Sequence, residues 1–440
     1  MSNLHPGGSG REPRYLTIFA MVAAGLVIFA ATTVFRIRDY TDKSIDLQVL
    51  FKMMGVALSL MVPTIALVSR RLTLSTPVLL AWLAMLISLV LSSAQAINFG
   101  LSLMNSVAML GCFLFCVWMT ERLGEDRVAS VLVSLVGFIA ICSLVVYFVY
   151  PELGRMRAWL GSEFGENNRI QGIAGTPNGL GSMTAMSLIF TLLYFGRVEK
   201  KVRSLMLMAA VPSAVCLIMS NSRMSMASLI VCATVYLASK GNRAANAGII
   251  ALGVAAVAAL FFSAPDMFLS SLARSGDASE ITSATGRSEI WAVVLEHVAA
   301  RPLTGYGYGM STSILPMDPR LFSVAAHTHN MYLEVLFSGG AISFSLLMVA
   351  VVSTLYVGLR TGCIEPVIIL LFYLLRGLTE PAPFDNLPSF AGYAFFLAVA
   401  FIVARARRAD EGKQRARASI AARSLARCRL NLSTVNGPAA

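Results

Sequence analysis

The sequence predicts an all-α polytopic membrane protein, and three observations support this fold class. Of 440 residues, 57% are hydrophobic and only 13% are charged, whereas soluble domains keep about a quarter of their residues charged. The mean hydropathy is +0.72. The apolar residues also gather in runs of about 20, which is the length that an α-helix needs to cross a bilayer.

Twelve apolar runs are candidate transmembrane helices. The first follows Arg11 and Arg14 without a small-residue cleavage site, so we interpret it as an uncleaved anchor. The runs lie near 15–34, 48–68, 76–94, 99–119, 128–149, 178–196, 204–220, 224–239, 244–263, 333–357, 363–379 and 388–404. They predict a cytoplasmic N-terminus (1–14), transmembrane helices 1–9 (15–263), a large periplasmic loop (264–331), transmembrane helices 10–12 (332–404) and a basic cytoplasmic tail (405–440).

The basic residues favour one orientation of this topology. With the N-terminus inside, the inner short loops carry more lysine and arginine than the outer ones. The tail holds nine basic residues against Asp410 and Glu411. Because cytoplasmic loops carry such an excess, we expect a multi-pass protein of a bacterial inner membrane with both termini in the cytoplasm. The net charge of +12 then indicates contact with anionic lipid, with a partner-binding tail as the alternative.

The connection at 264–331 is the longest loop of this topology, and long loops are usually functional or disordered. Its composition is not of low complexity, so we expect it to be functional and to contain short amphipathic helices. One such helix is predicted by apolar residues at helical spacing: Ile290, Trp291, Val294, Leu295 and Val298. The glycines of the following GYGYG stretch, Gly305, Gly307 and Gly309, predict a flexible turn.

Three of the four histidines lie in this same loop, and His327 and His329 are separated by one residue. Histidine can accept a proton near neutral pH, so both side chains are candidates for a catalytic or substrate-binding role. A metal site would need further ligands, and the sequence contains neither an HExxH nor a D-x-D motif. We therefore expect no metal and no other cofactor. A histidine that only packs within the loop is the alternative.

Four arginines are predicted at or beyond the outer ends of the apolar runs: Arg169, Arg223, Arg287 and Arg376. A charged side chain at membrane depth costs at least ~2.5 kcal/mol on insertion scales, and its default interpretation is functional. Guanidinium groups bind phosphate through a planar fork, so several of them around one outer cavity would suit a lipid-linked diphosphate. The alternative is an interfacial position or pairing with Glu163, Glu166, Glu289 or Glu380.

These motifs together resemble one family. The signature region of the O-antigen ligase and polymerase family of bacterial envelope glycosyltransferases resembles two stretches of this chain, GRSEIWAVVLEHVAARPLTGYGYG and HTHNMYLEVLFSGG. The resemblance extends over about 150–390, through NSRMSMA around Arg223 and RIQGIAGTPNGLG around Arg169. It implies about twelve spans with a large periplasmic loop over a membrane cavity. It also implies metal-independent glycosyl transfer from an undecaprenyl-diphosphate-linked glycan.

One local pattern distinguishes two branches of that family. In the ligases, a histidine followed by Asn, Ser or Gln precedes a G-x-x-G-T-T stretch after nine residues. Here His329, Asn330 and Gly340 fit that spacing, whereas Ser343, Phe344 and Ser345 replace the remainder. The departure favours the polymerase branch, in particular the exopolysaccharide polymerases that join repeat units.

The resemblance and the chemistry assign roles to the candidate residues. As catalytic residues, Arg287 and Arg223 would stabilise the departing diphosphate, and His329 would accept the proton of the attacking sugar hydroxyl or orient it. Tyr306 would offer a stacking face to a sugar ring or serve as an interfacial anchor. Substrate contacts are expected from Arg169, His327, Asn330, Tyr306 and Arg376.

The predicted function is thus the polymerisation of an exported polysaccharide of the exopolysaccharide or O-antigen type. The expected partners are an undecaprenyl-diphosphate-linked oligosaccharide as donor and acceptor, membrane lipid, and a chain-length regulator and a flippase of the same pathway; no nucleic acid is expected. One alternative is an O-antigen ligase, whose acceptor is a lipid A core. The other is a small-anion transporter, because arginines also line permeation paths.

Overall fold

The computed structural model describes most of the chain. Two parts of the predicted outer loop, 263–286 and 322–326, lie outside the described residues, as do the N-terminal residues 1–13 and the segment 157–168 with Glu163 and Glu166. The described ranges are 14–36, 46–70, 72–156, 169–241, 243–262, 287–321 and 327–435.

Within these ranges the secondary structure is helical, apart from an isolated bridge between Arg155 and Ile170. This confirms the all-α prediction for the described part of the chain, and each of the twelve apolar runs coincides with one helix. The helices that matter for the architecture are α1 (Arg14–Thr32), α2 (Leu47–Val68), α3 (Pro77–Ser92), α4 (Phe99–Leu123), α5 (Glu125–Val149), α6 (Pro151–Gly154), α7 (Pro177–Tyr194), α8 (Lys200–Ser220), α9 (Arg223–Lys240), α10 (Arg243–Phe262), α13 (Arg287–Ala300), α14 (Ser311–Ile314), α15 (Met331–Arg360), α16 (Ile364–Arg376) and α17 (Phe390–Val435).

Seven of the described helices are long and apolar enough to cross a membrane. They are α2, α3 with the short 3₁₀ turn that follows it, α4, α5, α8, α15 and α17. Shorter apolar stretches occur in α1 (Thr17–Thr32) and α10 (Ala245–Ala259). The chain is therefore a membrane protein by its helices, and the count of twelve spans stays a prediction.

The helix α16 is shorter than the span predicted at 363–379. Its 13 residues make it about 20 Å long at 1.5 Å per residue, whereas the hydrocarbon core of a bilayer is about 30 Å thick. The sequence places Arg376 near the outer end of this span. In the structure Arg376 ends α16 inside the protein, where it is only 2% exposed.

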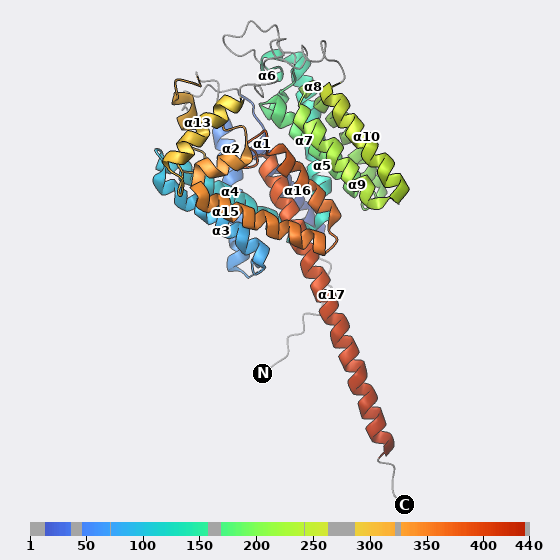
Figure 1. The fold of residues 1–440 in the computed structure, drawn as a ribbon. Coiled ribbons are helices and arrows are strands. Elements are labelled where there is room, and N and C mark those ends of the chain that lie inside the picture. The colour runs from blue at the N-terminus through green and yellow to red at the C-terminus, as the bar shows by residue number, and fades with distance from the viewer. Residues whose placement is uncertain are drawn as a thin grey trace, which may run out of the picture.

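The connections between helices gather at two ends of the bundle, as alternating spans require. At the end where α17 leaves the bundle (Figure 1), the Arg405 guanidinium pairs with Glu125 at 2.7 Å and with Glu365 at 2.6 Å. These carboxylates come from the first turns of α5 and α16. Two basic residues of the predicted inner loops also pair with them, Arg197 with Glu125 and Lys240 with Glu365. These contacts gather the starts of α5 and α16 and the residues Arg197 and Lys240 at one end of the bundle, and the predicted orientation in the membrane stays a prediction.

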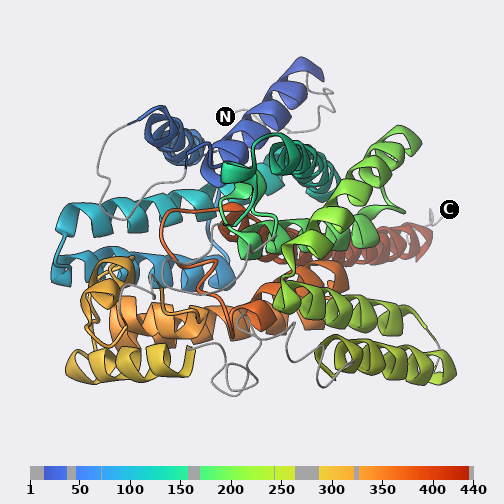
Figure 2. The same ribbon diagram turned by 90° about the horizontal axis from the view of Figure 1, so that it is seen from above.

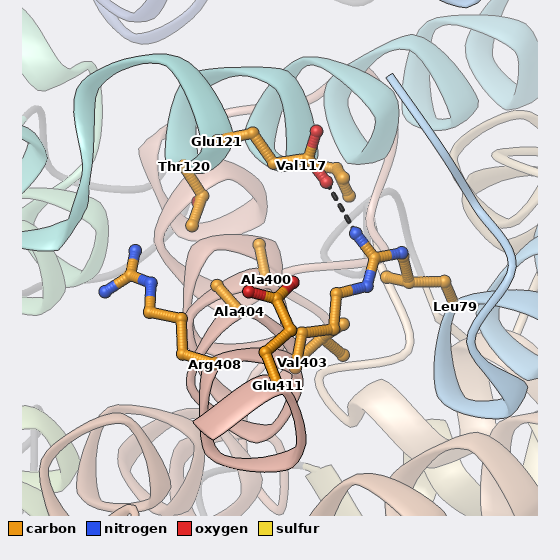
Figure 3. A pocket seen from close by; sticks show the side chains of 10 residues that line it. Leu79, Val117, Thr120, Glu121, Ala400, Val403, Ala404, Arg408 and Glu411 are labelled. Carbon is orange, nitrogen blue, oxygen red and sulfur yellow. Dashed lines mark hydrogen bonds and ion pairs between the residues drawn. The ribbon is translucent and has the colours of Figure 1, made fainter. Parts of the chain in front are cut away.

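The basic tail is not a separate segment in the structure. Helix α17 runs without interruption from Phe390 to Val435, so the predicted tail after residue 405 is a helical continuation that projects far from the bundle (Figure 1). Its first turns beyond the bundle are fixed by Arg407, which pairs with Glu121 at 2.7 Å. This pair borders a cavity of about 230 Å³ between α3, α4 and α17 (Figure 3).

Helix packing at the centre combines aromatic contacts with hydrogen bonds. The Trp82 ring of α3 meets Phe395 and Phe396 of α17 edge to face, at centroid distances of 5.3 and 5.6 Å. Its Nε1 donates to Thr354 Oγ1 of α15 at 2.9 Å. Close packing and interhelical hydrogen bonds are what hold helices together in lipid, so this cluster fixes α3, α15 and α17 as one frame. In the view from above, α13 lies beside α15 at one edge and α9 beside α10 at another (Figure 2).

Candidate functional site

The helix α15 is broken near its N-terminus, and the GYGYG segment lies against the break. Gly340 has φ 63° and ψ −165°, a conformation in which a Cβ would overlap the carbonyl group of Leu303. Backbone hydrogen bonds join the two segments, from Tyr306 N to Phe337 O at 3.0 Å and from Gly307 N to Ser338 O at 2.9 Å. The sequence predicts a flexible turn here. The structure instead shows a turn held to α15 along its length.

The predicted amphipathic helix is present as α13, and Arg287 is its first residue. Its buried face consists of Ile290, Val293 and Val294, which pack in a small apolar cluster with Phe337 of α15. Leu295, which the sequence places on the same face, is 50% exposed. The helix is therefore confirmed, with a buried face slightly different from the one predicted, and its packing fixes Arg287 relative to α15.

The segment that carries the two histidines is tied down through Thr328, which lies between them. Trp291 Nε1 of α13 donates to the carbonyl of Thr328 at 3.0 Å. The Thr328 hydroxyl donates to Glu334 Oε2 at 2.9 Å, and Glu334 is fully buried and also accepts from Ser311 Oγ at 2.7 Å. Because these contacts join α13, α14 and α15, the histidine segment has a defined position.

His329 has a left-handed backbone conformation, with φ 50°. Such a conformation is uncommon in residues other than glycine, and non-glycine residues held in it are found preferentially at functional sites. The His327 and His329 rings lie 6.2 Å apart and nearly perpendicular. The two histidines that the sequence selects are therefore neighbours in space.

Asn330 is the N-cap of α15. Its Oδ1 accepts from Tyr332 N at 2.9 Å and from Leu333 N at 3.0 Å, and its Nδ2 donates to Leu378 O at 3.1 Å. These bonds satisfy free amide groups of the first helical turn, as N-cap residues do. They also tie the helix start to the segment after α16. The side chain thus has a structural role, and its predicted substrate contact remains a prediction.

Two of the four predicted arginines, Arg169 and Arg376, contact Asn178 in the first turn of α7, and Arg287 is linked to it through Glu380. Arg169 donates to Asn178 Oδ1 at 2.9 Å, and Arg376 donates to the Asn178 carbonyl at 2.6 Å. Asn178 Nδ2 donates to Glu380 Oε1 at 2.7 Å, and Arg287 donates to the same oxygen at 3.2 Å. We refer to Arg169, Arg287, Arg376, Asn178 and Glu380 as the arginine cluster. The pairing of an arginine with Glu380, an alternative raised by the sequence, thus occurs for Arg287.

Two members of the cluster are held rigidly by other contacts. Arg169 follows residues outside the described ranges, but its carbonyl accepts from Met156 N at 2.9 Å and its Nε donates to Ser220 O at 2.8 Å. Arg376 also donates to Ser225 Oγ of α9 at 3.2 Å. Within the described residues no carboxylate forms an ion pair with Arg376, which is therefore a buried cation stabilised by neutral oxygens.

Arg223, the fourth arginine, is the first residue of α9. It lies two residues before Ser225, the serine that accepts from Arg376, so the start of α9 adjoins the arginine cluster. The structure therefore places the start of α9 next to Arg376 of the arginine cluster, and the common functional site on the outer side stays a prediction.

The site is built from helix N-termini. Helices α7, α9, α13 and α15 begin at Pro177, Arg223, Arg287 and Met331, and all four are linked to the turn at the end of α16. Met331 N donates to Gly377 O at 2.8 Å, and the contacts of Asn330, Arg376 and Glu380 complete the links. A helix N-terminus carries a partial positive charge and free amide groups, so it favours anions. Four arginines and one glutamate add a formal excess of three positive charges.

Tyr306 lies apart from the arginine cluster and is packed on several sides. Its ring stacks on Phe337 at a centroid distance of 4.9 Å, meets His297 edge to face, and lies 4.7 Å from the Arg301 guanidinium. The hydroxyl donates to the His297 carbonyl at 3.1 Å. These contacts give Tyr306 a packing role in the loop, and no contact of the ring favours the predicted stacking on a sugar.

Sequence reasoning missed Asn178 and undervalued Glu380. Asn178 joins three charged side chains, yet in the sequence it is one polar residue of the TPNGLG stretch. Glu380 follows the end of α16 by four residues, and the sequence indicates for it only a pairing partner of an arginine. The sequence feature that could have indicated Asn178 is its position as a polar residue in the first turn of an apolar helix. In the described residues no group of three His, Cys, Asp or Glu side chains could hold a metal ion.

Comparison with known proteins adds one match. Residues 208–348 match the family described as O-antigen ligase, and no curated protein matches the chain significantly. The matched region runs from α8 to α15 and includes Arg223, Arg287, His327 and His329. The resemblance noted in the sequence is therefore confirmed over this region, and the match supports a glycosyltransferase of the ligase or polymerase type.

Proposed function

We propose that the chain is a membrane glycosyltransferase that polymerises an exported bacterial polysaccharide of the exopolysaccharide or O-antigen type, and the match of residues 208–348 to the family described as O-antigen ligase supports this proposal. It joins undecaprenyl-diphosphate-linked repeat units at the periplasmic face of the inner membrane. The observation that supports this proposal most is the arginine cluster, in which Asn178 and Glu380 link three arginines by hydrogen bonds among helix N-termini. Such a site suits a diphosphate.

The proposed reaction breaks the bond between the anomeric carbon of the donor glycan and its diphosphate oxygen. A hydroxyl of the acceptor glycan attacks that carbon, the diphosphate leaves with the bonding electrons, and the hydroxyl proton passes to His329. Negative charge develops on the departing diphosphate, where Arg287 and Arg223 stabilise it, assisted by Arg169 and Arg376. Donors aimed at developing charge are usually the largest single contribution to catalysis.

His329 is suited to the role of base by its position. It directly precedes Asn330, the N-cap of α15, on a segment fixed by Thr328 and Glu334, so the imidazole is presented on a rigid support. A base held within reach of the hydroxyl contributes about 10²–10⁴-fold. His327, whose ring lies 6.2 Å from that of His329, would orient the acceptor.

The second candidate function is that of an O-antigen ligase, which the description of the matched family favours. The chemistry at the donor is the same in both reactions, and the acceptor differs. The sequence departs from the ligase pattern at Ser343, which is buried and lies 2.8 Å from Ser88 of α3 across their hydroxyl oxygens. Because the two functions differ in their acceptor, a test must identify the acceptor rather than the donor.

The two variants that test the proposal are Arg287→Ala and His329→Asn, introduced into the full-length chain in the native host lacking its own copy. Asparagine tolerates the left-handed conformation of residue 329, so the second variant removes the imidazole with little backbone strain. We expect both proteins to insert normally and single repeat units to remain attached to the lipid carrier. If long polymer instead accumulates on the carrier without transfer to lipid A core, the chain is a ligase.

The matched control is Arg320→Ala, in the same loop but outside the arginine cluster. Arg320 is 54% exposed and pairs with Asp318 and Glu296, and its hydrogen bonds lower the pKa of Asp318 to about 2. This variant should make polymer of normal length. Normal polymer from both Arg287→Ala and His329→Asn would refute the proposed function.

A further inference from the structure

Glu380 supplies the carboxylate of the arginine cluster, and its contacts bear on how the cluster binds an anion. Its Oε1 accepts from Arg287 at 3.2 Å and from Asn178 Nδ2 at 2.7 Å. The side chains of Arg287 and Glu380 are 18% and 14% exposed, so the pair is shielded from water. An anion is thus already bound to Arg287 at the proposed diphosphate site.

The backbone fixes where this carboxylate lies. Glu380 N donates to Arg376 O at 3.1 Å, so the chain turns back after α16. This turn presents Glu380 to the side-chain amide of Asn178, which Arg169 also contacts, while Arg376 contacts the backbone carbonyl of the same residue. In this hydrogen-bonded set there are three guanidinium groups and one carboxylate. Glu380 alone therefore does not balance the charge of the three guanidinium groups that this set contains.

A carboxylate oxygen and a phosphate oxygen compete for the same donors of a guanidinium group. Two anions on one arginine also repel each other strongly in a shielded site, where the effective dielectric constant is about 20 rather than 80. Arg287 therefore cannot hold Glu380 and a donor diphosphate equally well at the same time. One of the two contacts must lengthen when the other forms.

We propose that Glu380 is an internal counter-ion that takes the place of a donor phosphate oxygen on Arg287 in the empty site and yields Arg287 when the donor diphosphate binds. The inference rests on the proposed function, since it assumes that Arg287 binds that diphosphate. Glu380 keeps the arginines positioned between reactions. It also weakens the hold on the diphosphate product, which promotes the release of that product.

This role differs from two others that a glutamate could have. As the base of the reaction, Glu380 would be needed for turnover itself. As a structural partner, it would be needed only to hold Arg287 in place, and its loss would weaken ligand binding. As a displaced counter-ion it opposes ligand binding, so removal of its charge strengthens binding. The sign of the change in affinity therefore separates the three roles.

The variant Glu380→Gln keeps the size of the side chain and an oxygen that can accept from Asn178, but it removes the charge. We would measure binding of inorganic diphosphate to the purified full-length protein in lipid nanodiscs by titration calorimetry at constant ionic strength. We expect Glu380→Gln to lower the dissociation constant by about tenfold or more, since a negative charge adjacent to the ligand is removed. Glu380→Asp, which keeps the charge, should bind like the unchanged protein.

The matched control is Glu296→Gln, which removes a surface carboxylate that pairs with Arg320 in the same loop and should leave diphosphate binding unchanged. Unchanged or weaker binding by Glu380→Gln overturns the proposal. In the glycosyl transfer reaction, Glu380→Gln should lower KM for the donor; a fall in kcat of a hundredfold or more at unchanged KM would assign Glu380 as the base and also overturn it.

Arg287→Ala separates this inference from the proposed function. If the unchanged protein binds diphosphate and Arg287→Ala does not, the diphosphate site stands and the Glu380 variants decide the counter-ion role alone. If the two proteins bind diphosphate equally, Arg287 is not a diphosphate ligand, and both the proposed function at this site and the counter-ion role are refuted.

Discussion

Replacement of Arg376 by methionine should separate the needs of the fold from those of the reaction. Arg376 is 2% exposed, and its guanidinium donates to Asn178 O at 2.6 Å and to Ser225 Oγ at 3.2 Å. Hydrogen bonds to a charged group contribute about 1.5–3 kcal/mol each. Against this stands the cost of burying the charge, which is several kcal/mol per ion. Because the two contributions nearly cancel and methionine has a similar volume, we expect Arg376→Met to be as stable as the unchanged protein or more stable.

The effect on activity should be large. Removal of one donor that stabilises developing charge typically costs 10²–10³-fold in rate, and Arg376 also holds Asn178, which positions Arg169 and Glu380. We therefore expect Arg376→Met to form polymer at least about a hundred times more slowly, with the thermal unfolding temperature of the purified protein unchanged or raised. Both quantities would be measured on the same preparation, rate by incorporation of labelled lipid-linked repeat unit.

The control is Arg203→Met, the same substitution at an arginine whose guanidinium also binds neutral backbone oxygens, those of Val198 at 2.9 Å and Gly196 at 3.0 Å. Arg203 lies at the start of α8, away from the arginine cluster, so this variant should keep its rate. The reasoning is refuted if Arg376→Met retains activity within about threefold of the unchanged protein. It is also refuted if polymer falls only in proportion to the amount of folded protein.

Three further predictions concern the framework of the site. Gly340→Ala should reduce the amount of folded protein in membranes, because φ 63° alone costs an alanine about 1–3 kcal/mol and its Cβ would overlap a backbone carbonyl. The control is Gly392→Ala, which should fold normally because the nearest atom lies 3.7 Å from an added Cβ. Equal yields of folded protein from Gly340→Ala and Gly392→Ala would contradict the strain expected at Gly340. Asn330→Ala should lower the free energy of unfolding by about 1 kcal/mol through loss of the N-cap, which thermal unfolding would measure. Asn330→Asp keeps a capping oxygen and should be more stable than Asn330→Ala. Equal stability of the two variants would argue against the capping role. Glu125→Gln removes the charge of a buried carboxylate and leaves the partly buried Arg405 paired with Glu365, so it should cost roughly 3 kcal/mol without changing the rate per folded molecule. A reduced rate would connect this end of the bundle to catalysis.

The sequence was sufficient for the helices and for the segments that carry the site. Hydropathy and period locate helices from local residues alone, so each of the twelve apolar runs coincides with a helix, and α13 begins at the predicted arginine. The gathering of three of the four histidines in one loop, and the position of arginines at the ends of apolar runs, select His329, Arg287 and Arg376 without any knowledge of their contacts. The family match then includes His329 and Arg287.

The sequence was not sufficient for features that depend on distant parts of the chain. Asn178 acquires its importance from Arg376 and Glu380, which lie about 200 residues away in sequence. The break of α15 at Gly340 arises because the GYGYG segment packs there, and the same packing surrounds Tyr306 with other side chains. The helix α16 is also shorter than the span predicted from the sequence, because it ends at Arg376 with Gly377 as its C-cap.

The central claim is that the arginine cluster and His329 transfer a glycan from a lipid-linked diphosphate. The most direct test is to incubate the purified full-length protein in liposomes with labelled undecaprenyl-diphosphate-linked repeat unit and a metal chelator, and to follow both the glycan and the lipid. We predict glycans of two or more repeat units and one undecaprenyl diphosphate released for each bond formed, both lost in Arg287→Ala and His329→Asn. If the repeat units remain unjoined while the liposomes become permeable to small anions through the unchanged protein but not through Arg287→Ala, the chain is a transporter and the claim is wrong.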